Sequence, residues 1–441
     1  MGITTDNIRN YIYGLNEPVE LSDGTVKPLI CFDNAATTLA LAPVMDEIAD
    51  KLAGYGSIGR GFSLKSDHST DIYESTRRKV LDFTCADPEE YTCFFVSSTT
   101  DGLNKLASAL ITDRNDLVLA TRMEHHSNDL TWRERCRVIY ADTNEQGRID
   151  YGSVEDQLKT HDVKYLCITA ASNVTGFVTD IHRAAALAHR YGAQIIVDGA
   201  QIVAHRKVCL QGASPEENID FFVFSSHKMY SPFGGGAVIG LKSVLDDHIP
   251  EFYGGGTVMI VADDWVRYQK APAVYEAGSP NYPGAVGLGK AIDVLTEIGF
   301  DSIAEHDRSL TGRLIAGLKR FDNIVIYGDT DDLSDRVGVV SFNFTDINSY
   351  VLAENLAKNG GIATRRGAFC AHPYVWRLMD IPEEDIRGFI RCTDANTPGM
   401  IRVSFGIYNT DAEVDEFLRI LEEISAQTRE SMADCPFKAE Y

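Results

Sequence analysis

The chain has 441 residues, a formal net charge of −23 and a pI near 4.8. A chain of this length exceeds the usual size of one core, so we expect a large domain and a smaller one. Apolar residues make up 44% and charged residues 24%, which is typical of a folded protein and argues against disorder. The negative charge argues against binding to nucleic acid or to an anionic membrane, because neutralising phosphates requires clustered Lys and Arg.

Residues 1–20 contain no basic region followed by an apolar stretch, and no run of about 18 apolar residues occurs in the chain. We therefore expect a cytoplasmic protein without a membrane partner. The nine cysteines show neither CxxC spacing nor a paired-histidine pattern, so we expect neither a disulfide framework nor structural zinc. No metal site is expected at His125 and His126 either, since no second cluster of ligands lies nearby in sequence.

The region from residue 31 to 300 alternates short apolar runs with stretches of helical periodicity. This pattern predicts a doubly wound α/β domain with a mainly parallel sheet. Several runs are apolar without alternation, as is expected of strands that helices cover on both faces. In chain order, we expect strands at 93–98, 117–121, 163–170, 194–200 and 220–226.

The region 301–441 mixes helical stretches with expected strands at 323–328, 337–344 and 400–409. It predicts a smaller α+β domain, on which the N-terminal segment 1–30 is expected to pack. Within this region, segment 379–399 is acidic and lacks clear periodicity, so we expect a mobile loop or an insertion.

Polar side chains follow the predicted strands of the large domain. In open α/β sheets, ligands bind beyond the carboxyl ends of the strands, so we expect these side chains to face one crevice. They are Thr99, Thr100, Glu124, His125, Asn173, Asp198, Gln201, Ser225, His227 and Lys228.

These groups match the needs of pyridoxal 5′-phosphate (PLP), which requires a Schiff-base lysine, a carboxylate at the pyridine nitrogen, a phosphate site and a stacking group. Lys228 follows a strand end rich in Ser and His, where a merely solvated lysine is unexpected. Asp198 ends an apolar run and would keep the ring nitrogen protonated, although a helix-capping role is the alternative. Thr99 and Thr100 precede a predicted helix whose N-terminus would bind the phosphate.

A series of motifs runs in order through most of the chain: DNAATT (33–38), EHHSN (124–128), SNVTG (172–176), DGAQ (198–201), SSHKMYSPFGGG (225–236), EAGSPN (276–281), RRGAFCAHP (365–373) and RVSFGIYNT (402–410). With these motifs the chain resembles the class V aminotransferase superfamily of fold-type I PLP enzymes. Within that superfamily it is most similar to the branch of cysteine desulfurases and selenocysteine lyases.

The resemblance implies that Lys228 binds the cofactor covalently and carries protons, that His125 stacks on the ring, and that Asp198 contacts the pyridine nitrogen. It implies that Arg402 pairs with the substrate carboxylate, a bidentate task suited to a guanidinium group. The family is dimeric, so Ser279 is expected to reach the phosphate of a second subunit. The further implied contacts are those of Thr99, Thr100, Ser225 and His227 with the phosphate, of Gln201 and Asn173 with the phenolic oxygen of the cofactor or the substrate carboxylate, and of Asn34 with the substrate.

Cys370 matches the position of the persulfide-forming nucleophile of this branch. Arg365 and Arg366 would lower the pKa of its thiol if they faced the sulfur. A buried structural cysteine is the alternative. The resemblance thus implies conversion of L-cysteine to L-alanine with a persulfide on Cys370, and transfer of the sulfur to a protein or a small molecule.

Two alternative functions, and the identity of the substrate and the sulfur acceptor, stay open. A C–S β-lyase or an aminotransferase of the same superfamily, acting on a substituted cysteine or another amino acid, would need no thiol nucleophile. A PLP-binding module without turnover is disfavoured by Arg402, which such a module would not require. The interval from Cys370 to Arg402 is 402 − 370 = 32 positions, longer than expected, and leaves the substrate and the sulfur acceptor undecided.

Overall fold

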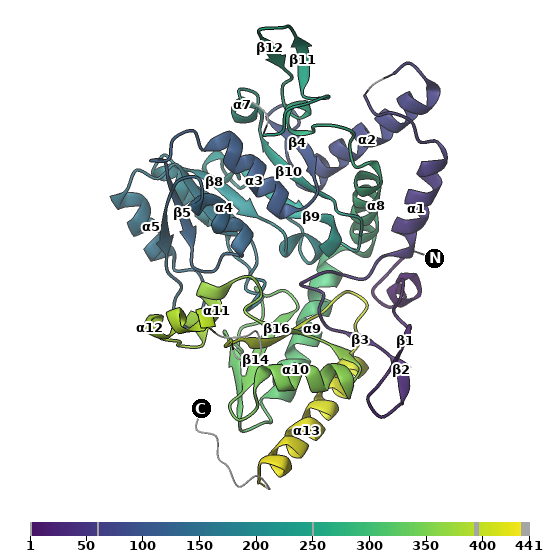
Figure 1. The fold of residues 1–441 in the computed structure, drawn as a ribbon, viewed down its shortest axis with the longest axis vertical. Helices are drawn as coiled ribbons and strands as arrows, with labels where there is room; N and C mark the ends of the chain where they lie inside the picture. The colour runs from purple at the N-terminus through teal and green to yellow at the C-terminus, as the bar shows by residue number, and fades with distance from the viewer. Residues whose placement is uncertain (1, 60, 249–250, 392–396, 434–441) are drawn as a thin grey trace. The chain divides into compact units, whose positions relative to one another are not determined.

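A computed structural model describes residues 2–59, 61–248, 251–391 and 397–433, and the chain divides into two compact units (Figure 1). Unit 1 contains Met1–Tyr13, Thr37–Ser172 and Phe177–Ala304. Unit 2 contains Gly14–Ala36, Asn173–Gly176 and Glu305–Tyr441. Asn173, which follows a strand of unit 1 in the sequence, thus belongs to unit 2.

Unit 1 is built on a seven-stranded sheet of order β4-β10-β9-β8-β7-β5-β6. Strand β10 is antiparallel to both of its neighbours, and the other pairs are parallel, which confirms the predicted α/β class. All five strands predicted for this domain are present. The strands are β4 (Tyr91–Val96), β5 (Leu117–Thr121), β6 (Arg137–Ala141), β7 (Tyr165–Thr169), β8 (Gln194–Asp198), β9 (Phe221–Ser225) and β10 (Gly236–Leu241).

Helices cover this sheet because their apolar faces pack on buried strand residues. Helix α3 (Thr99–Leu110) lies against β9 and β10, and a Cβ at its Gly102 would lie 2.6 Å from Val223 Cγ1 and 2.7 Å from Val238 Cγ2. The glycine therefore lets α3 approach the sheet closely, which brings its N-terminus to the end of β9. The other helices of unit 1 are α1 (Ala42–Ala53), α2 (Leu64–Phe83), α4 (Leu130–Arg133), α5 (Tyr151–Thr160), α6 (Ile181–Arg190), α7 (Lys242–Leu245) and α8 (Tyr282–Ile298).

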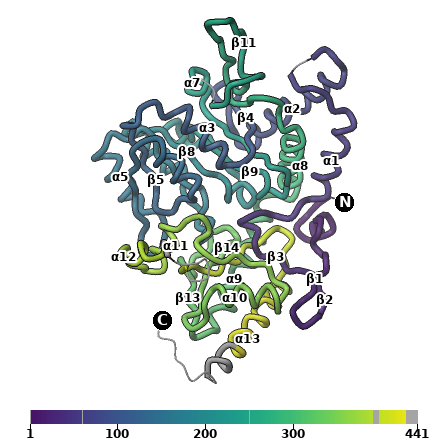
Figure 2. The backbone as a smooth tube through the Cα atoms, in the orientation of Figure 1, coloured from purple at the N-terminus to yellow at the C-terminus, as the bar shows by residue number. Residues whose placement is uncertain are grey.

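A β-hairpin of β11 (Val258–Val261) and β12 (Val266–Tyr268) projects from the body of unit 1 (Figure 2). Short 3-10 helices occur in the connections of this unit. Those at the strand ends are η2 (His126–Asn128), η3 (Ile202–Ala204) and η5 (Ser226–Lys228), and the others are η1 (Ile8–Tyr11), η4 (Pro215–Glu217) and η6 (Ala273–Tyr275).

Unit 2 is an α+β unit with an antiparallel sheet of order β13-β14-β17-β16. Its apolar core contains Phe32, Phe405 and Phe417, whose rings contact edge to face. The three strands predicted for this region are present. The elements are β1 (Pro18–Glu20), β2 (Val26–Pro28), β3 (Ile30–Cys31), β13 (Ile324–Tyr327), β14 (Val339–Phe344), β15 (Ile362–Ala363), β16 (Arg365–Gly367), β17 (Met400–Ser404), α10 (Ser349–Lys358), α11 (His372–Leu378), α12 (Glu383–Ile386), η7 (Arg387–Arg391) and α13 (Asp411–Ala433), with α9 (Phe300–Leu318) beginning in unit 1.

The segment expected to be a mobile loop or an insertion, 379–399, contains regular structure in its described part. The short helices α12 and η7 occupy Glu383–Arg391, while residues 392–396 lie outside the described residues. The ring of Phe389 contacts that of Trp376 on α11 edge to face, with centroids 5.5 Å apart. A tertiary contact therefore orders a segment that has no periodicity of its own.

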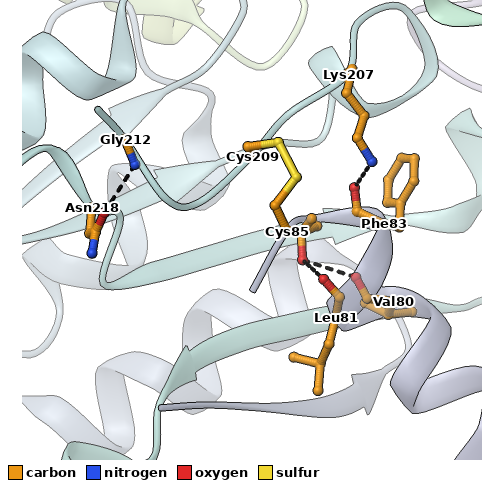
Figure 3. The surroundings of a disulfide bond; sticks show 9 residues. Val80, Leu81, Phe83, Cys85, Lys207, Cys209, Gly212 and Asn218 are labelled. Carbon is orange, nitrogen blue, oxygen red and sulfur yellow. Dashed lines mark hydrogen bonds between the residues drawn. A yellow bond between two sulfur atoms is a disulfide. The ribbon is translucent and has the colours of Figure 1, made fainter. Parts of the chain in front are cut away.

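The expectation of no disulfide is also corrected, because Cys85 and Cys209 are joined in unit 1 (Figure 3). Their Cα atoms are 4.8 Å apart, and 124 positions separate them in the sequence. Cys85 follows α2, and Lys207, near Cys209, donates a hydrogen bond to the carbonyl of Phe83 at the end of that helix. Such a long-range pairing leaves no local pattern in the sequence.

Candidate functional site

Lys228 and Asp198 lie in unit 1 at the ends of neighbouring strands. Lys228 ends η5, directly after β9, and is half-buried, while Asp198 is the last residue of β8 and is 3% exposed. The carboxylate of Asp198 accepts a 2.9 Å hydrogen bond from the amide of Ala200. Burial raises the pKa of Asp198, while that amide and the charge of Lys228 act in the opposite direction. The two predicted residues thus interact electrostatically, as a buried acid and a nearby amine.

The N-terminus of α3 meets β9 through Thr99 and Ser225. The Ser225 hydroxyl lies 2.7 Å from both the backbone nitrogen and the hydroxyl of Thr99. Next along the helix, Thr100 is exposed, and its hydroxyl lies 2.7 Å from that of Ser127. Helix amides and hydroxyl groups in this arrangement suit a phosphate group.

His227 directly precedes Lys228, and hydrogen bonds to its own backbone carbonyl hold it in place. The carbonyl of His227 accepts hydrogen bonds from the hydroxyls of Thr37 and Thr38, at 3.2 and 3.0 Å, and the Thr38 hydroxyl also accepts one from the amide of Tyr230. Burial, together with the charge of Lys228, lowers the pKa of His227 to about 4. The imidazole is therefore neutral at pH 7 and serves as a hydrogen-bonding group without charge.

His125 caps the N-terminus of the short helix η2, where its Nδ1 accepts a 3.1 Å hydrogen bond from the amide of Ser127. Beneath it, Glu124 is buried and accepts hydrogen bonds from the Thr121 hydroxyl and from Asn128 Nδ2. Burial raises the pKa of Glu124 to about 8, and the charge of Asp198 acts in the same direction. Glu124 is thus a buried acid that supports the loop of His125, a role that the sequence analysis did not assign.

Two further predicted residues lie in unit 1 with different exposures. Gln201 directly precedes η3 and is 5% exposed, close in sequence to Asp198. Ser279 is exposed in the segment before α8.

Arg402 lies in unit 2, on β17, and is 2% exposed. Its Nη2 donates a 3.0 Å hydrogen bond to Asp33 Oδ1, and its Nη1 donates one of 2.9 Å to the backbone carbonyl of Asn173. Its Nε is buried without a hydrogen-bond partner among the described residues. Burial lowers the pKa of Arg402, which the charge of Asp33 partly offsets. A buried guanidinium with an unused donor fits a carboxylate ligand.

Cys370 stands near Arg402 on a turn formed by residues 368–371. The turn is closed by a 2.8 Å hydrogen bond from the amide of Ala371 to the carbonyl of Ala368. Both central residues are left-handed, with φ of 51° for Phe369 and 56° for Cys370, a conformation that costs about 1 to 2 kcal/mol per residue. Cys370 is exposed and interacts electrostatically with Arg402. The structure thus brings Arg402 and Cys370 together in unit 2.

Two contacts hold this strained turn. Asn173 Nδ2 donates a 2.6 Å hydrogen bond to the carbonyl of Phe369, and the guanidinium carbon of Arg402 lies 4.8 Å from the centroid of the Phe369 ring. Of the two arginines predicted near the thiol, Arg365 pairs with Asp33 at 3.6 Å, and Arg366 donates a 2.7 Å hydrogen bond to the carbonyl of Thr397.

Asn34 is 3% exposed and lies within a hydrogen-bonded network of unit 2. Its Nδ2 donates to the carbonyl of Ser404 at 3.0 Å and to Oδ1 of Asn409 at 3.3 Å, and its Oδ1 accepts from the hydroxyl of Tyr408 at 2.5 Å. Substrate contact by Asn34 stays a prediction.

Two functional candidates escaped the sequence analysis, Asp33 beside Arg402 and Phe369 beneath it. Asp33 lies in the motif DNAATT, so the motif offered a signal without a role for this residue. Phe369 lies in the motif RRGAFCAHP, but its left-handed backbone and its contact with Arg402 cannot be recognised from the neighbouring residues in the sequence.

The residues present fit PLP. In unit 1, a buried carboxylate, a nearby lysine and a helix N-terminus with hydroxyls correspond to the pyridine nitrogen, the aldehyde and the phosphate of the cofactor. Among the described residues, no group of three or more His, Cys, Asp or Glu side chains could hold a metal ion. In the same part of the chain, no helix is both long and apolar enough to cross a membrane.

Comparisons with known proteins agree with this chemistry. The family model for class-V aminotransferases matches residues 30–417. A cysteine desulfurase of Haloferax volcanii is 33% identical over 413 residues, which is 92% of this chain and 91% of that protein. A cysteine desulfurase of Escherichia coli is 31% identical over 408 residues, which is 90% of this chain and 93% of that protein.

Solved structures resemble this fold over almost the whole chain. The apo cysteine desulfurase of Thermococcus onnurineus has a TM-score of 0.83 and 28% identity, covering 97% of this chain and all of that one. The E. coli cysteine desulfurase CsdA has a TM-score of 0.80 and 25% identity over the same shares. The chain therefore belongs to the class V aminotransferase family of PLP-dependent enzymes.

Proposed function

We propose that this protein is a PLP-dependent cysteine desulfurase, which converts L-cysteine to L-alanine and holds the sulfur as a persulfide on Cys370. The observation that carries the proposal is the exposed thiol of Cys370 on a strained turn beside the buried Arg402. An aminotransferase or a β-lyase would need no such nucleophile. The named cysteine desulfurases that match nearly the whole chain support the same reaction.

Arg402 binds the carboxylate of the substrate in this proposal. Its Nε has no partner among the described residues, and Asp33 and the carbonyl of Asn173 hold the guanidinium in place. A fixed, buried guanidinium orients the amino acid before reaction, which lowers the entropy cost of reaching the transition state.

Lys228 and Asp198 perform the proton chemistry. When bound, PLP withdraws electrons from the substrate and stabilises negative charge at its Cα. Lys228, which lies at the end of β9, binds the cofactor and accepts the proton from Cα. Asp198 would keep the proton on the pyridine nitrogen through its carboxylate, whose charged form the amide of Ala200 and the charge of Lys228 favour against the effect of burial. His125 would stack on the ring of the cofactor, Thr99, Thr100, Ser225 and His227 would hold its phosphate, and Gln201 would lie near its phenolic oxygen.

Cys370 completes the reaction as a thiolate that attacks the sulfur of the substrate. A sulfur–sulfur bond forms as the carbon–sulfur bond breaks, and the electron pair of the broken bond stays on Cβ, which is then protonated. The products are L-alanine and a persulfide on Cys370. Because Cys370 is exposed, the persulfide is accessible to an acceptor, either a protein or a small molecule.

A homodimer is part of the proposal. The hairpin β11–β12 exposes large apolar side chains, among them Val261 and Trp265, which are 62% and 52% exposed. Exposed apolar surface of this kind is typical of a protein–protein interface. In such a dimer, the exposed Ser279 would serve the phosphate of the partner subunit.

The test compares native PLP-loaded protein with the variant Cys370→Ala. Both are incubated with L-cysteine and a reductant, and alanine, sulfide and pyruvate are measured. We expect alanine and sulfide from the native protein, loss of both in the variant, and an unchanged PLP absorbance. Cys136→Ser, at a half-buried cysteine of unit 1, is the matched control and should keep native turnover. Pyruvate and ammonia that do not depend on Cys370 would identify a β-lyase and overturn the proposal.

A further inference from the structure

A pocket of about 690 Å³ lies within unit 2, beside the turn that carries Cys370. Its lining comes from the strand β16, the helix α11, the segment α12–η7 and residues 397–398. Two of the lining residues, Ala368 and His372, stand two positions before and two positions after Cys370. The volume is in the range of sites that bind small organic molecules. No step of the proposed reaction uses this pocket.

The charged side chains among the described lining residues have one sign. Arg366 and Arg387 line the pocket, and none of the described lining residues is an Asp or a Glu. This contrasts with the whole chain, in which 64 acidic residues outnumber 41 Lys and Arg. The acidic residues of α12, Glu383, Glu384 and Asp385, are exposed and are not part of the lining. A locally basic pocket in an acidic protein favours an anionic ligand.

The two arginines differ in how firmly they are held. Arg366 is fixed by its hydrogen bond to the carbonyl of Thr397, and its guanidinium carbon lies 5.4 Å from the centroid of the Tyr350 ring. Arg387 is exposed at the start of η7. Arg366 is thus preorganised in the lining of the pocket, and Arg387 is able to approach a ligand from solvent.

Aromatic side chains provide the other surface of the pocket. The centroid of the Trp376 ring lies 4.9 Å from that of His372 and 5.5 Å from that of Phe389, in both cases edge to face. The ring planes meet at 70° and 61°. Differently oriented rings offer both faces and edges to a planar group, and such contacts add to the free energy gained by burying it.

We propose that this pocket is a binding site for a small planar aromatic carboxylate, with the carboxylate between Arg366 and Arg387 and the ring against Trp376 and Phe389. A guanidinium group such as that of Arg387 pairs with a carboxylate through two hydrogen bonds. The ligand would lie against the Cys370 turn through Ala368 and His372. The binding site does not depend on the reaction at Cys370, so the two proposals stand or fall separately.

The test is a calorimetric titration of the PLP-loaded native protein with 1-naphthoate. We expect saturable binding with a Kd below about 1 mM, and at least tenfold weaker binding of the neutral analogue 1-naphthamide, because it lacks the charge. Arg387→Gln should weaken the binding of 1-naphthoate by about tenfold. Since Arg387 is exposed, the variant should fold as the native protein does. Arg377→Gln is the matched control, because Arg377 is exposed on α11 and is not part of the lining.

Several results would overturn this proposal. One is the absence of saturable binding to the native protein, and another is equal affinity of native protein and Arg387→Gln. Equal affinity for 1-naphthoate and 1-naphthamide would remove the role of the charge. Binding that is lost in Arg402→Gln and kept in Arg387→Gln would place the acid at the proposed substrate arginine.

Discussion

Asn173 donates a 2.6 Å hydrogen bond from Nδ2 to the backbone carbonyl of Phe369, the residue before Cys370. The same residue accepts a hydrogen bond from Arg402 through its own backbone carbonyl. Asn173 therefore contacts both the turn that presents the thiol and the arginine proposed to bind the substrate. Only the hydrogen bond to Phe369 uses the side chain of Asn173. A substitution of Asn173 therefore removes this bond and keeps the backbone contact with Arg402.

The variant Asn173→Ala should lose sulfur transfer while it keeps proton chemistry. Without the hydrogen bond to Phe369, the strained turn relaxes and the thiol loses its position, so we expect kcat for alanine formation to fall by about tenfold or more. Exchange of the Cα proton of L-alanine in D₂O should stay near the native rate, because Lys228 and Asp198 are unchanged. Asn355→Ala, at a half-buried asparagine of α10, is the control. Native kcat in Asn173→Ala would contradict the positioning role.

The variant Asp33→Asn should destabilise the protein by about 3 kcal/mol, because it leaves the buried guanidinium of Arg402 without its carboxylate partner. Urea unfolding followed by circular dichroism measures the change. Asp411→Asn is the matched control, since Asp411 pairs with Arg313 at 3.7 Å on the surface and should cost less than about 1 kcal/mol. Equal losses in the two variants would show that Asp33 does not compensate a buried charge.

The variant Lys228→Ala should no longer bind PLP covalently. After reduction with borohydride, native protein should carry the cofactor mass on the peptide that contains Lys228, and the variant should carry none. The measurement is mass spectrometry of proteolytic peptides. Lys270→Ala, at an exposed lysine paired with Asp246, should be labelled as the native protein is. Labelling of another lysine in native protein would refute the assignment of Lys228.

The variant Glu124→Gln should change how stability depends on pH. Folding raises the pKa of Glu124 from an ordinary value near 4.5 to about 8, so the folded state holds this proton more tightly than the unfolded state. The resulting stability is fully present below pH 4.5 and is lost as the pH rises through about 8, by at most about 1.4 kcal/mol per pH unit. Glutamine resembles the protonated form at every pH.

The measurement for Glu124 is the free energy of unfolding at pH 5 and at pH 8.5. We expect the stability of Glu124→Gln relative to native protein to increase between these two values. Glu354→Gln, at a surface ion pair with Lys358, is the control and should follow the native profile. A constant difference between Glu124→Gln and native protein across this range would show that Glu124 is not protonated on folding.

Much of the fold was predictable because strands and helices impose local periodicities. The five strands predicted for unit 1 and the three predicted for unit 2 appear as apolar runs near their predicted positions, and polar groups follow those of unit 1 where the chain leaves a buried sheet. Residues such as Asp198 and Lys228 were found by that rule. The short helices of segment 379–391 were not predicted, because the segment has no periodicity and packs through the contact of Phe389 with Trp376.

The sequence by itself determined which chemical groups are present and which strand ends carry them, since both follow from short segments with a regular period. Only the tertiary structure decided that Asn173 belongs to unit 2, that its side chain bonds to Phe369, and that Asp33 compensates Arg402. It also paired Cys85 with Cys209 and built a basic, aromatic pocket beside Cys370. These contacts join residues far apart in sequence, so packing and the need to satisfy buried polar groups determine them, and neither leaves a local pattern.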